Sequence, residues 1–512
     1  MALFRAAATV GSLTFLSRIA GFVRDILMAA ILGAGPIADA FFVALKLPNI
    51  FRRITAEGAF SISFVPMFSG FEETKGRKDA MSFAAEAQAV MLAILLPFTV
   101  LMILAMPWII NVITPGFSDD PVRYDLGVEL GRYTFPYILL MSLVALYGGV
   151  LNSFNRFAAF AVAPIFFNLT LIAALLWFTE VGETPAHALA VAVTISGVIQ
   201  LLWMLGNAMR FKLLIRIDWP RFTARIKKLF RLMGPAVLGA GVVQINLMID
   251  MFLASFLEKG AISYLYYADR LYQLPLSVVG IAIGTAMLPM LSRKIKAKDD
   301  KGAMTLMRQA ILFGLILAVP AAAALMVLSS EIMITLFERG AFDRDASLAS
   351  ASVLNAYAFS LPAFILVKVF STMFFAREDT KTPVKLAIIG TVVNTAFGII
   401  LIFPFEYVGI AMATAIAAWL QAILLMIAAR KIMPDIWGTL KKKTLKTIVA
   451  TALMMIALFA IEPFLFFETT IQRIVSLSVM VIAGGSVYFT GLMLTKTIQL
   501  HELKGFLKRK SV

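Results

Sequence analysis

Fourteen long apolar stretches run through this 512-residue chain, each bounded by charged residues, Gly or Pro. A helix needs roughly 20 mostly apolar residues to cross the hydrocarbon core of a bilayer. β-barrel strands instead alternate in polarity over ~10 residues, so that class is excluded. We predict an all-α integral membrane protein with fourteen transmembrane helices. The stretches lie near 7–33, 38–69, 87–113, 128–153, 158–179, 186–209, 232–257, 262–291, 307–336, 348–376, 384–404, 407–429, 447–466 and 473–495.

The composition agrees with lipid as the solvent of most of the chain. Hydrophobic residues make up 61% and charged residues 15% of it, whereas soluble proteins carry about 25% charged residues. A soluble enzyme, a disordered chain and a nucleic-acid-binding module are therefore excluded. Cysteine is absent, and only His187 and His501 are present, which excludes thiolate chemistry and histidine metal clusters. With no G-x-x-x-x-G-K-[ST] segment for ATP either, we expect a transporter without a cofactor and not an enzyme.

Lysine and arginine are distributed unevenly among the loops between these stretches. With a cytoplasmic N-terminus, the cytoplasmic tails and loops hold 33 Lys and Arg and the outside loops hold five. Cytoplasmic loops of membrane proteins carry such an excess. The bias predicts that both termini are cytoplasmic, and it explains most of the net charge of +16 without nucleic acid. Outside loop 114–127, with Asp119, Asp120 and Asp125, is expected to be solvated; a gate is the alternative.

Two parts of the chain resemble each other at an offset near 225 residues. FPYILL at 135–140 matches LPAFIL at 361–366, and each is followed at the same distance by an asparagine, Asn168 or Asn394. Each repeat contains six spans, so both copies insert in the same orientation and form two lobes around a shared cavity. The predicted parts are an N-lobe at 1–209, a basic cytoplasmic linker at 210–231, a C-lobe at 232–431, and spans 13 and 14 with a basic tail at 432–512.

Charged residues also lie within or at the rim of the spans, where each costs ~2.5–3.5 kcal/mol at the bilayer centre. Positive charge is in surplus among them, which predicts an anionic ligand. Arginine offers a planar fork that matches phosphate bidentately and keeps its proton. We predict that Arg18, Arg24, Arg52 and Arg270, from both lobes, bind this anion. The full set is Arg18, Arg24, Lys46, Arg52, Arg53, Arg132, Arg270 and Lys368 against Asp25, Asp39, Glu57, Asp250 and Asp269.

Local pairing offers a structural explanation for some of these charges. Arg18 and Asp25 are seven residues apart and share a helical face, so their pairing would leave Arg24 over. Arg53 and Glu57 are four apart and are predicted to form a structural pair. Asp39 is interpreted as a helix-start residue, and a proton or ion carrier is the alternative.

The remaining charges are candidates for cavity or coupling roles. Asp250 either binds a coupling cation or neutralises Lys368 or Arg270. Asp269 precedes Arg270, and adjacent residues on a helix do not face each other, so Arg270 is expected to point into the cavity. Asp25, Asp39, Lys46, Asp269 and Lys368 complete the candidates, and no firm metal site is predicted.

Five segments resemble the MurJ/MviN family of lipid II flippases, within the multidrug/oligosaccharidyl-lipid/polysaccharide exporter superfamily. The resemblance covers essentially the whole chain. The part from LPN to AEGAF is its most specific portion. The segments are SRIAGFVRD (17–25), GAGPIADAFFVALKLPNIFRRITAEGAFSISFVPMF (33–68), FPYILLMSLVALYGGVLNSFNRF (135–157), YYADRLYQLP (266–275) and KTPVKLAI (381–388).

This resemblance implies a substrate: lipid II, the undecaprenyl-pyrophosphate-linked peptidoglycan precursor. It would move from the cytoplasmic to the periplasmic leaflet of the bacterial inner membrane by alternating access. The family's functional arginines fall on Arg18, Arg24, Arg52 and Arg270, and its acidic position falls on Asp39. The resemblance further implies a groove for the lipid tail in spans 13 and 14, a cation site for which Asp250 is a candidate, and a membrane potential or a gradient of Na⁺ or H⁺ as the energy source. Membrane lipids and cell-wall synthesis proteins are the implied partners.

Other functions fit parts of this pattern. An exporter of another polyprenyl-pyrophosphate-linked glycan would need the same arginines. A cation-coupled drug exporter would instead carry unpaired carboxylates. A non-transporting membrane scaffold would tolerate replacement of the arginines.

Overall fold

The computed structural model describes residues 2–434, 436, 438, 440–465, 468–495 and 497. The side chains of 2–8, 54–57, 236, 238–240, 242–243, 278–279 and 281–286 fall outside this description. The described chain is helical and contains no β-strand; one isolated β-bridge joins Arg339 and Phe342. The predicted all-α class is therefore confirmed.

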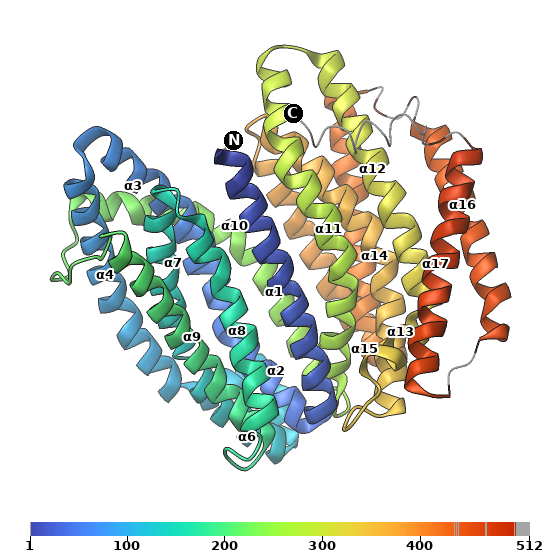
Figure 1. Cartoon of the computed structure of the whole chain (residues 1–512), viewed down its shortest axis with the longest axis horizontal. Coiled ribbons are helices and arrows are strands. Elements are labelled where there is room, and N and C mark those ends of the chain that lie inside the picture. The colour runs from blue at the N-terminus through green and yellow to red at the C-terminus, as the bar shows by residue number, and fades with distance from the viewer. Residues whose placement is uncertain are drawn as a thin grey trace. The chain divides into compact units, whose positions relative to one another are not determined.

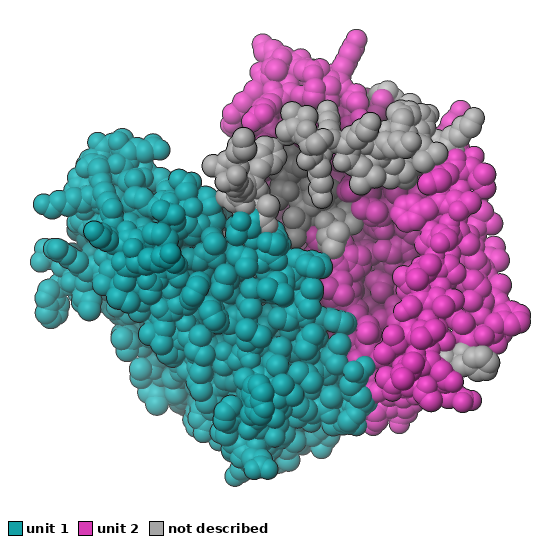
Figure 2. All heavy atoms as spheres, in the orientation of Figure 1, with its two compact units in different colours: residues 1–263, 339–342 teal, residues 264–338, 343–512 magenta. Residues whose placement is uncertain are grey.

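Contacts divide the chain into two compact units, drawn in different colours in Figure 2. Unit 1 contains residues 1–263 and 339–342, and unit 2 contains residues 264–338 and 343–512. Helix α10 belongs to unit 1 in this division because it packs on α2, α3 and η1. The lobes predicted from the repeat, 1–209 and 232–431, describe chain topology and stay a prediction.

Unit 1 is a bundle of helices, coloured blue to green in Figure 1. Its main helix pairs are α1 with α8, α2 with α6, and α8 with α9. Its elements are α1 (Ala2–Leu32), α2 (Pro36–Ile54), η1 (Thr55–Phe60), α3 (Ser61–Lys75), α4 (Arg77–Leu104), α5 (Met106–Ile113), η2 (Pro115–Asp119), α6 (Pro121–Thr134), α7 (Tyr137–Ser153), α8 (Phe157–Trp177), α9 (Pro185–Arg210) and α10 (Ala224–Ser255).

Unit 2 is also helical, and its last two helices pack on each other and on α12. The Tyr488 hydroxyl of α17 donates a 2.7 Å hydrogen bond to the Ile316 carbonyl of α12. This bond fastens α17 to α12 within unit 2. The elements are α11 (Ala261–Lys296), α12 (Asp300–Val327), α13 (Ser329–Phe337), α14 (Arg344–Ala376), α15 (Lys381–Ile432), α16 (Leu440–Ile461), η3 (Glu462–Phe464) and α17 (Thr470–Leu494).

Nine helical segments in the described part are long and apolar enough to cross a membrane. One of them, α15, contains two predicted spans, 384–404 and 407–429. It bends at Glu406, whose φ of 49° and ψ of −129° are not helical, two residues after Pro404. Proline removes a backbone donor and favours such a break. The predicted total of fourteen spans stays a prediction.

The predicted span 38–69 is not one helix. It is divided into α2, the π-helical turn η1 and α3, with Gly58 inside the turn. Around it, aromatic side chains form the core of unit 1. Phe64 stacks on Phe60 and Phe83, with ring centroids 5.0 and 5.4 Å apart. This packing holds the irregular segment in place, and π-helical turns of this kind occur frequently at functional sites.

Candidate functional site

Arg24 and Asp25 of α1 form a buried ion pair, although they are neighbours in sequence. Their side chains are almost fully buried, and Arg24 Nη2 and Nε lie 2.6 and 3.1 Å from Asp25 Oδ1. The expectation that Arg24 would be left over is therefore wrong. An arginine is long enough to turn its guanidinium back onto the adjacent carboxylate, which the helical-face argument ignores.

Asn168 of α8 extends this pair into a network across two helices. Its Oδ1 accepts a 2.8 Å hydrogen bond from Arg24 Nη1, and its Nδ2 donates to the Ser17 carbonyl at 2.8 Å. The Arg24 guanidinium also lies 5.4 Å from the ring centroid of Phe167. Asn168 was not predicted as a site residue. The available signal was a polar residue within an apolar stretch, at the end of the repeated segment.

The other predicted basic residues of unit 1 lie on α1 and α2. Arg18, Lys46 and Arg52 are half-buried and Arg53 is exposed. Arg52 Nε donates a 3.1 Å hydrogen bond to Asn49 Oδ1, one turn earlier on α2. The predicted Arg53–Glu57 pair involves the Glu57 side chain, which lies outside the described residues.

In unit 2, Asp269 and Arg270 use different partners. Asp269 accepts a hydrogen bond from Gln273, one turn along α11. The guanidinium of Arg270 lies 4.5 Å from the ring centroid of Tyr266, and a cation over an aromatic face is stabilised in this way. Lys368 of α14 is exposed, and its amine lies over Gly280 of α11.

Asp250 is half-buried on α10 in unit 1, and Asn246 Nδ2 lies 3.5 Å from its carboxylate. Its predicted neutralisation by Lys368 or Arg270, and the convergence of Arg270 with the arginines of unit 1, join residues of different units and stay predictions. Among the described residues, no three His, Asp or Glu side chains gather into a metal site.

Asp39 caps a helix that begins 222 residues later in the chain. Its carboxylate is fully buried and accepts hydrogen bonds from Gly260 N at 2.7 Å, Ser263 N at 2.9 Å and Ser263 Oγ at 2.6 Å. Helix α11 begins at Ala261, so these N–H groups are its unsatisfied first donors. Asp39 does lie in the first turn of its own helix α2, as predicted. The sequence did not reveal that its side chain serves α11.

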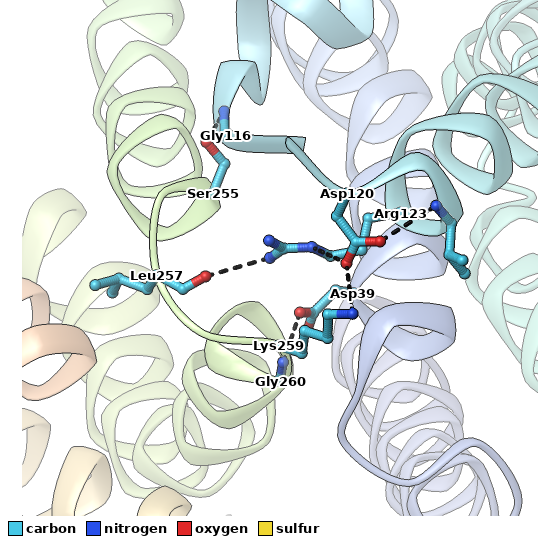
Figure 3. A network of polar contacts seen from close by, with 9 residues as sticks. Asp39, Gly116, Asp120, Arg123, Ser255, Leu257, Lys259 and Gly260 are labelled. Carbon is cyan, nitrogen blue, oxygen red and sulfur yellow. Dashed lines mark hydrogen bonds and ion pairs between the residues drawn. The ribbon is translucent and has the colours of Figure 1, made fainter. Parts of the chain in front are cut away.

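Asp120 and Arg123 contact the same segment close to Asp39, as Figure 3 shows. Asp120 Oδ2 lies 3.1 Å from both Lys259 Nζ and Arg123 Nε. Arg123 Nη1 donates to the Leu257 carbonyl at 3.3 Å, and Gly116 N donates to Ser255 Oγ at 3.1 Å. We call this network, from Asp39, Gly116, Asp120 and Arg123 to residues 255–263, the Asp39–Asp120 clamp.

Burial at the clamp contradicts the prediction that loop 114–127 is solvated, at least for Asp120. This side chain is buried, whereas Asp119 and Asp125 are exposed. Burial alone would raise the pKa of Asp120. The hydrogen bond and charge of Lys259, together with Arg123, outweigh it and hold the pKa below its ordinary value. The carboxylate is therefore charged and paired at neutral pH.

A second contact within unit 1 joins the end of α1 to residues 339–342. Ala341 N donates a 2.8 Å hydrogen bond to the Ala30 carbonyl. Gly33 follows α1 with a φ of +68°, and a Cβ there would lie 2.4 Å from the Ala341 carbonyl oxygen. Both the positive φ and the close approach require glycine at this position.

We expect Gly33→Ala to lower the free energy of unfolding by about 1–3 kcal/mol from the positive φ alone. The clash with Ala341 should add to this loss. Thermal unfolding of the purified protein measures it. Gly35→Ala is the matched control, because no atom lies within 4 Å of its added Cβ. Equal melting temperatures for the two variants would contradict the proposed contact.

Comparisons with known proteins identify the family. The family model described as "Lipid II flippase MurJ" matches residues 28–484. A probable lipid II flippase MurJ of Rhizobium tropici is 40% identical over 100% of this chain and 97% of its own length. That of Rickettsia prowazekii is 35% identical, over 97% of this chain and 99% of its own.

Solved structures agree with this assignment. A lipid II flippase MurJ in an inward closed conformation has a TM-score of 0.78 and 25% identity, covering 94% of this chain and 97% of that one. An inward-facing MATE family multidrug transporter has a TM-score of 0.69 at 14% identity, covering 85% of this chain and 99% of that one, and shares the fold alone. The chain is thus a multi-pass membrane protein that belongs to the lipid II flippase MurJ family.

Proposed function

We propose that this protein moves lipid II from the cytoplasmic to the periplasmic leaflet of the bacterial inner membrane by alternating access. Both of its termini lie in the cytoplasm in this proposal. The observation that carries the proposal is similarity to lipid II flippases along the whole chain, at up to 40% identity among the relatives described above. Translocation breaks no covalent bond, so no catalytic residue is needed.

The pyrophosphate of lipid II carries two negative charges, which hydrocarbon would exclude. We assign its binding to Arg18, Arg24, Arg52 and Arg270. Asp25 and Asn168 hold the Arg24 guanidinium within the buried network of α1 and α8. A guanidinium has five N–H donors. Arrival of the diphosphate would replace the carboxylate as the partner of Arg24, so the buried arginine stays compensated before and after substrate binds.

The Asp39–Asp120 clamp would act as the periplasmic gate of this cycle. It joins Ser263, in the first turn of α11, to Asp39 of α2, and both residues belong to unit 1. Opening toward the periplasm would require Asp39 to release Gly260 and Ser263.

The membrane potential can drive translocation, because the outside is positive and attracts the anionic head group outward. Each charge moved gains ~2.3 kcal/mol per 100 mV. A gradient of Na⁺ or H⁺, coupled to transport by binding of the cation at Asp250, is the alternative energy source. Cell-wall synthesis proteins, which supply and consume lipid II, are the expected partners.

Depletion of the protein from living cells tests the proposed function. We expect lipid II to accumulate in the cytoplasmic leaflet, where a membrane-impermeant reagent added outside does not reach it. Wall synthesis should stop as a result. If lipid II stays accessible from outside and only a surface polysaccharide changes, the substrate is another lipid-linked glycan. If neither changes, the protein is not a flippase of this class.

A further inference from the structure

The segment that joins α9 to α10 combines positive charge with exposed apolar side chains. Residues 210–231 contain eight Lys and Arg and one acidic residue, Asp218. Residues 213–223 form no helix or strand and can be followed as the green loop beside α4 in Figure 1. Ile217, Trp219 and Phe222 are 91, 78 and 59% exposed. Such side chains at the tip of a loop have no role in the core of unit 1.

The segment is nevertheless fixed to unit 1 at both ends. At its start, Arg77 donates to the Phe211 carbonyl at 3.3 Å, and the Arg156 guanidinium lies 4.2 Å from the Phe211 ring centroid. At its end, Arg225 forms an ion pair with the buried Glu86 of α4. Thr223 Oγ1 also donates to Glu86, at 2.7 Å. These contacts fix both ends of the segment, so the exposed apolar side chains between them are presented at the surface by an anchored loop.

An apolar groove of about 930 Å³ lies between this segment and α4. Residues 217–220 form one wall, and the outer face of α4 from Ala89 to Leu104 forms the other. Helix α4 is one of the candidate membrane spans, and only 28% of its apolar window is buried. The groove is continuous with that exposed face, so lipid chains around α4 can enter it.

Three basic side chains in the first two turns of α10, close in sequence to this segment, have no ion-pair partner in the part of the chain that the structure describes. Lys227, Lys228 and Arg231 are exposed in the first two turns of α10, and no described carboxylate pairs with them. Cations at a helix N-terminus oppose the helix dipole and destabilise the helix, unless an anion compensates for them. Arg225, at the same helix start, is neutralised by the buried Glu86.

We propose that residues 216–231 bind anionic phospholipids, with the phosphodiester head groups on Lys227, Lys228 and Arg231. Ile217, Trp219 and Phe222 enter the acyl region of the same leaflet, and an acyl chain occupies the groove along α4. Tryptophan favours this interfacial depth, and basic clusters beside a span attract anionic lipid. A nucleic acid would match the charge but would leave the apolar tips and the groove in water.

Quenching of Trp219 fluorescence by brominated lipids tests the proposal. The full-length protein is reconstituted with brominated phosphatidylglycerol or with brominated phosphatidylcholine at equal mole fraction. The signal of Trp219 is obtained by difference from the W219F variant. We expect the anionic lipid to quench Trp219 more strongly. The triple variant K227Q/K228Q/R231Q should reduce this preference roughly fivefold or more. Loss of a single basic residue near an anionic membrane surface already changes binding by about this factor.

The matched control is R293Q/K296Q/K301Q, which removes the same residue types from exposed positions at and beyond the end of α11. It should keep the full preference of Trp219 for phosphatidylglycerol. Equal quenching by both lipids would overturn the proposal, as would absence of quenching or an unchanged preference in K227Q/K228Q/R231Q. None of these readouts depends on lipid II transport, so the proposal and the flippase function can fail separately.

Discussion

Replacement of Arg24 by alanine is expected to abolish lipid II translocation while the protein still inserts into the membrane. The substitution removes an arginine assigned to the diphosphate and breaks its buried ion pair with Asp25. Breaking a buried ion pair by removing one partner costs about 3–5 kcal/mol. Lipid II accessibility from outside the cell measures transport, and thermal unfolding of the purified variant measures stability.

The double variant Arg24→Ala/Asp25→Ala separates the two roles of Arg24. Removal of both charges leaves no buried carboxylate to neutralise, so much of the stability should return. If Arg24 binds the diphosphate, transport stays absent in the double variant although the protein is folded. Recovery of transport together with stability would instead show that Arg24 only neutralises Asp25, and the assigned role in substrate binding would be wrong.

Replacement of Asp39 by alanine is expected to open the Asp39–Asp120 clamp and to stop transport. It leaves two backbone N–H groups and one hydroxyl without their acceptor. Each buried donor without a partner costs about 1–3 kcal/mol. Asp39→Asn keeps one acceptor oxygen, so its loss of stability should lie between those of the wild type and Asp39→Ala.

Cysteine labelling can measure the opening, because the native sequence contains no cysteine. Ala261 is fully buried at the start of α11, so Ala261→Cys should react slowly with a membrane-impermeant maleimide added outside. Adding Asp39→Ala should accelerate the reaction tenfold or more, which corresponds to ~1.4 kcal/mol in the opening equilibrium. Unchanged labelling and an unchanged melting temperature would show that Asp39 does not hold this segment.

The fold class followed from the sequence because burial in lipid leaves a local signature. A spanning helix must be apolar for about 20 consecutive residues, and this requirement does not depend on which helices become neighbours. The irregular parts were harder to locate. The interruption of span 38–69 by the π-helical turn Thr55–Phe60 depends on the packing of Phe60 and Phe64 in a core formed by several helices.

The sequence identified the charged residues of the candidate site but not the residues that each of them contacts. Arg24, Asp25 and Asp39 attract notice because charge is costly in a membrane span. Helical spacing suggested Arg18 as the partner of Asp25, which stays a prediction, and it overlooked the contact of Arg24 with its neighbour Asp25. Asn168 and Asp120 were missed or misjudged, because neither a lone asparagine nor a loop aspartate shows from sequence that it is buried.

The sequence by itself determined that this chain spans a membrane, that it resembles a family of lipid II flippases, and which charges stand in apolar surroundings. Each of these properties depends only on the types of residues and on their order along the chain. Only the tertiary structure decided that Asp39 caps α11, that Asn168 holds Arg24, and that Asp120 fastens Lys259. Those contacts join residues more than 130 positions apart, and hydrogen bonds depend on distances that folding creates.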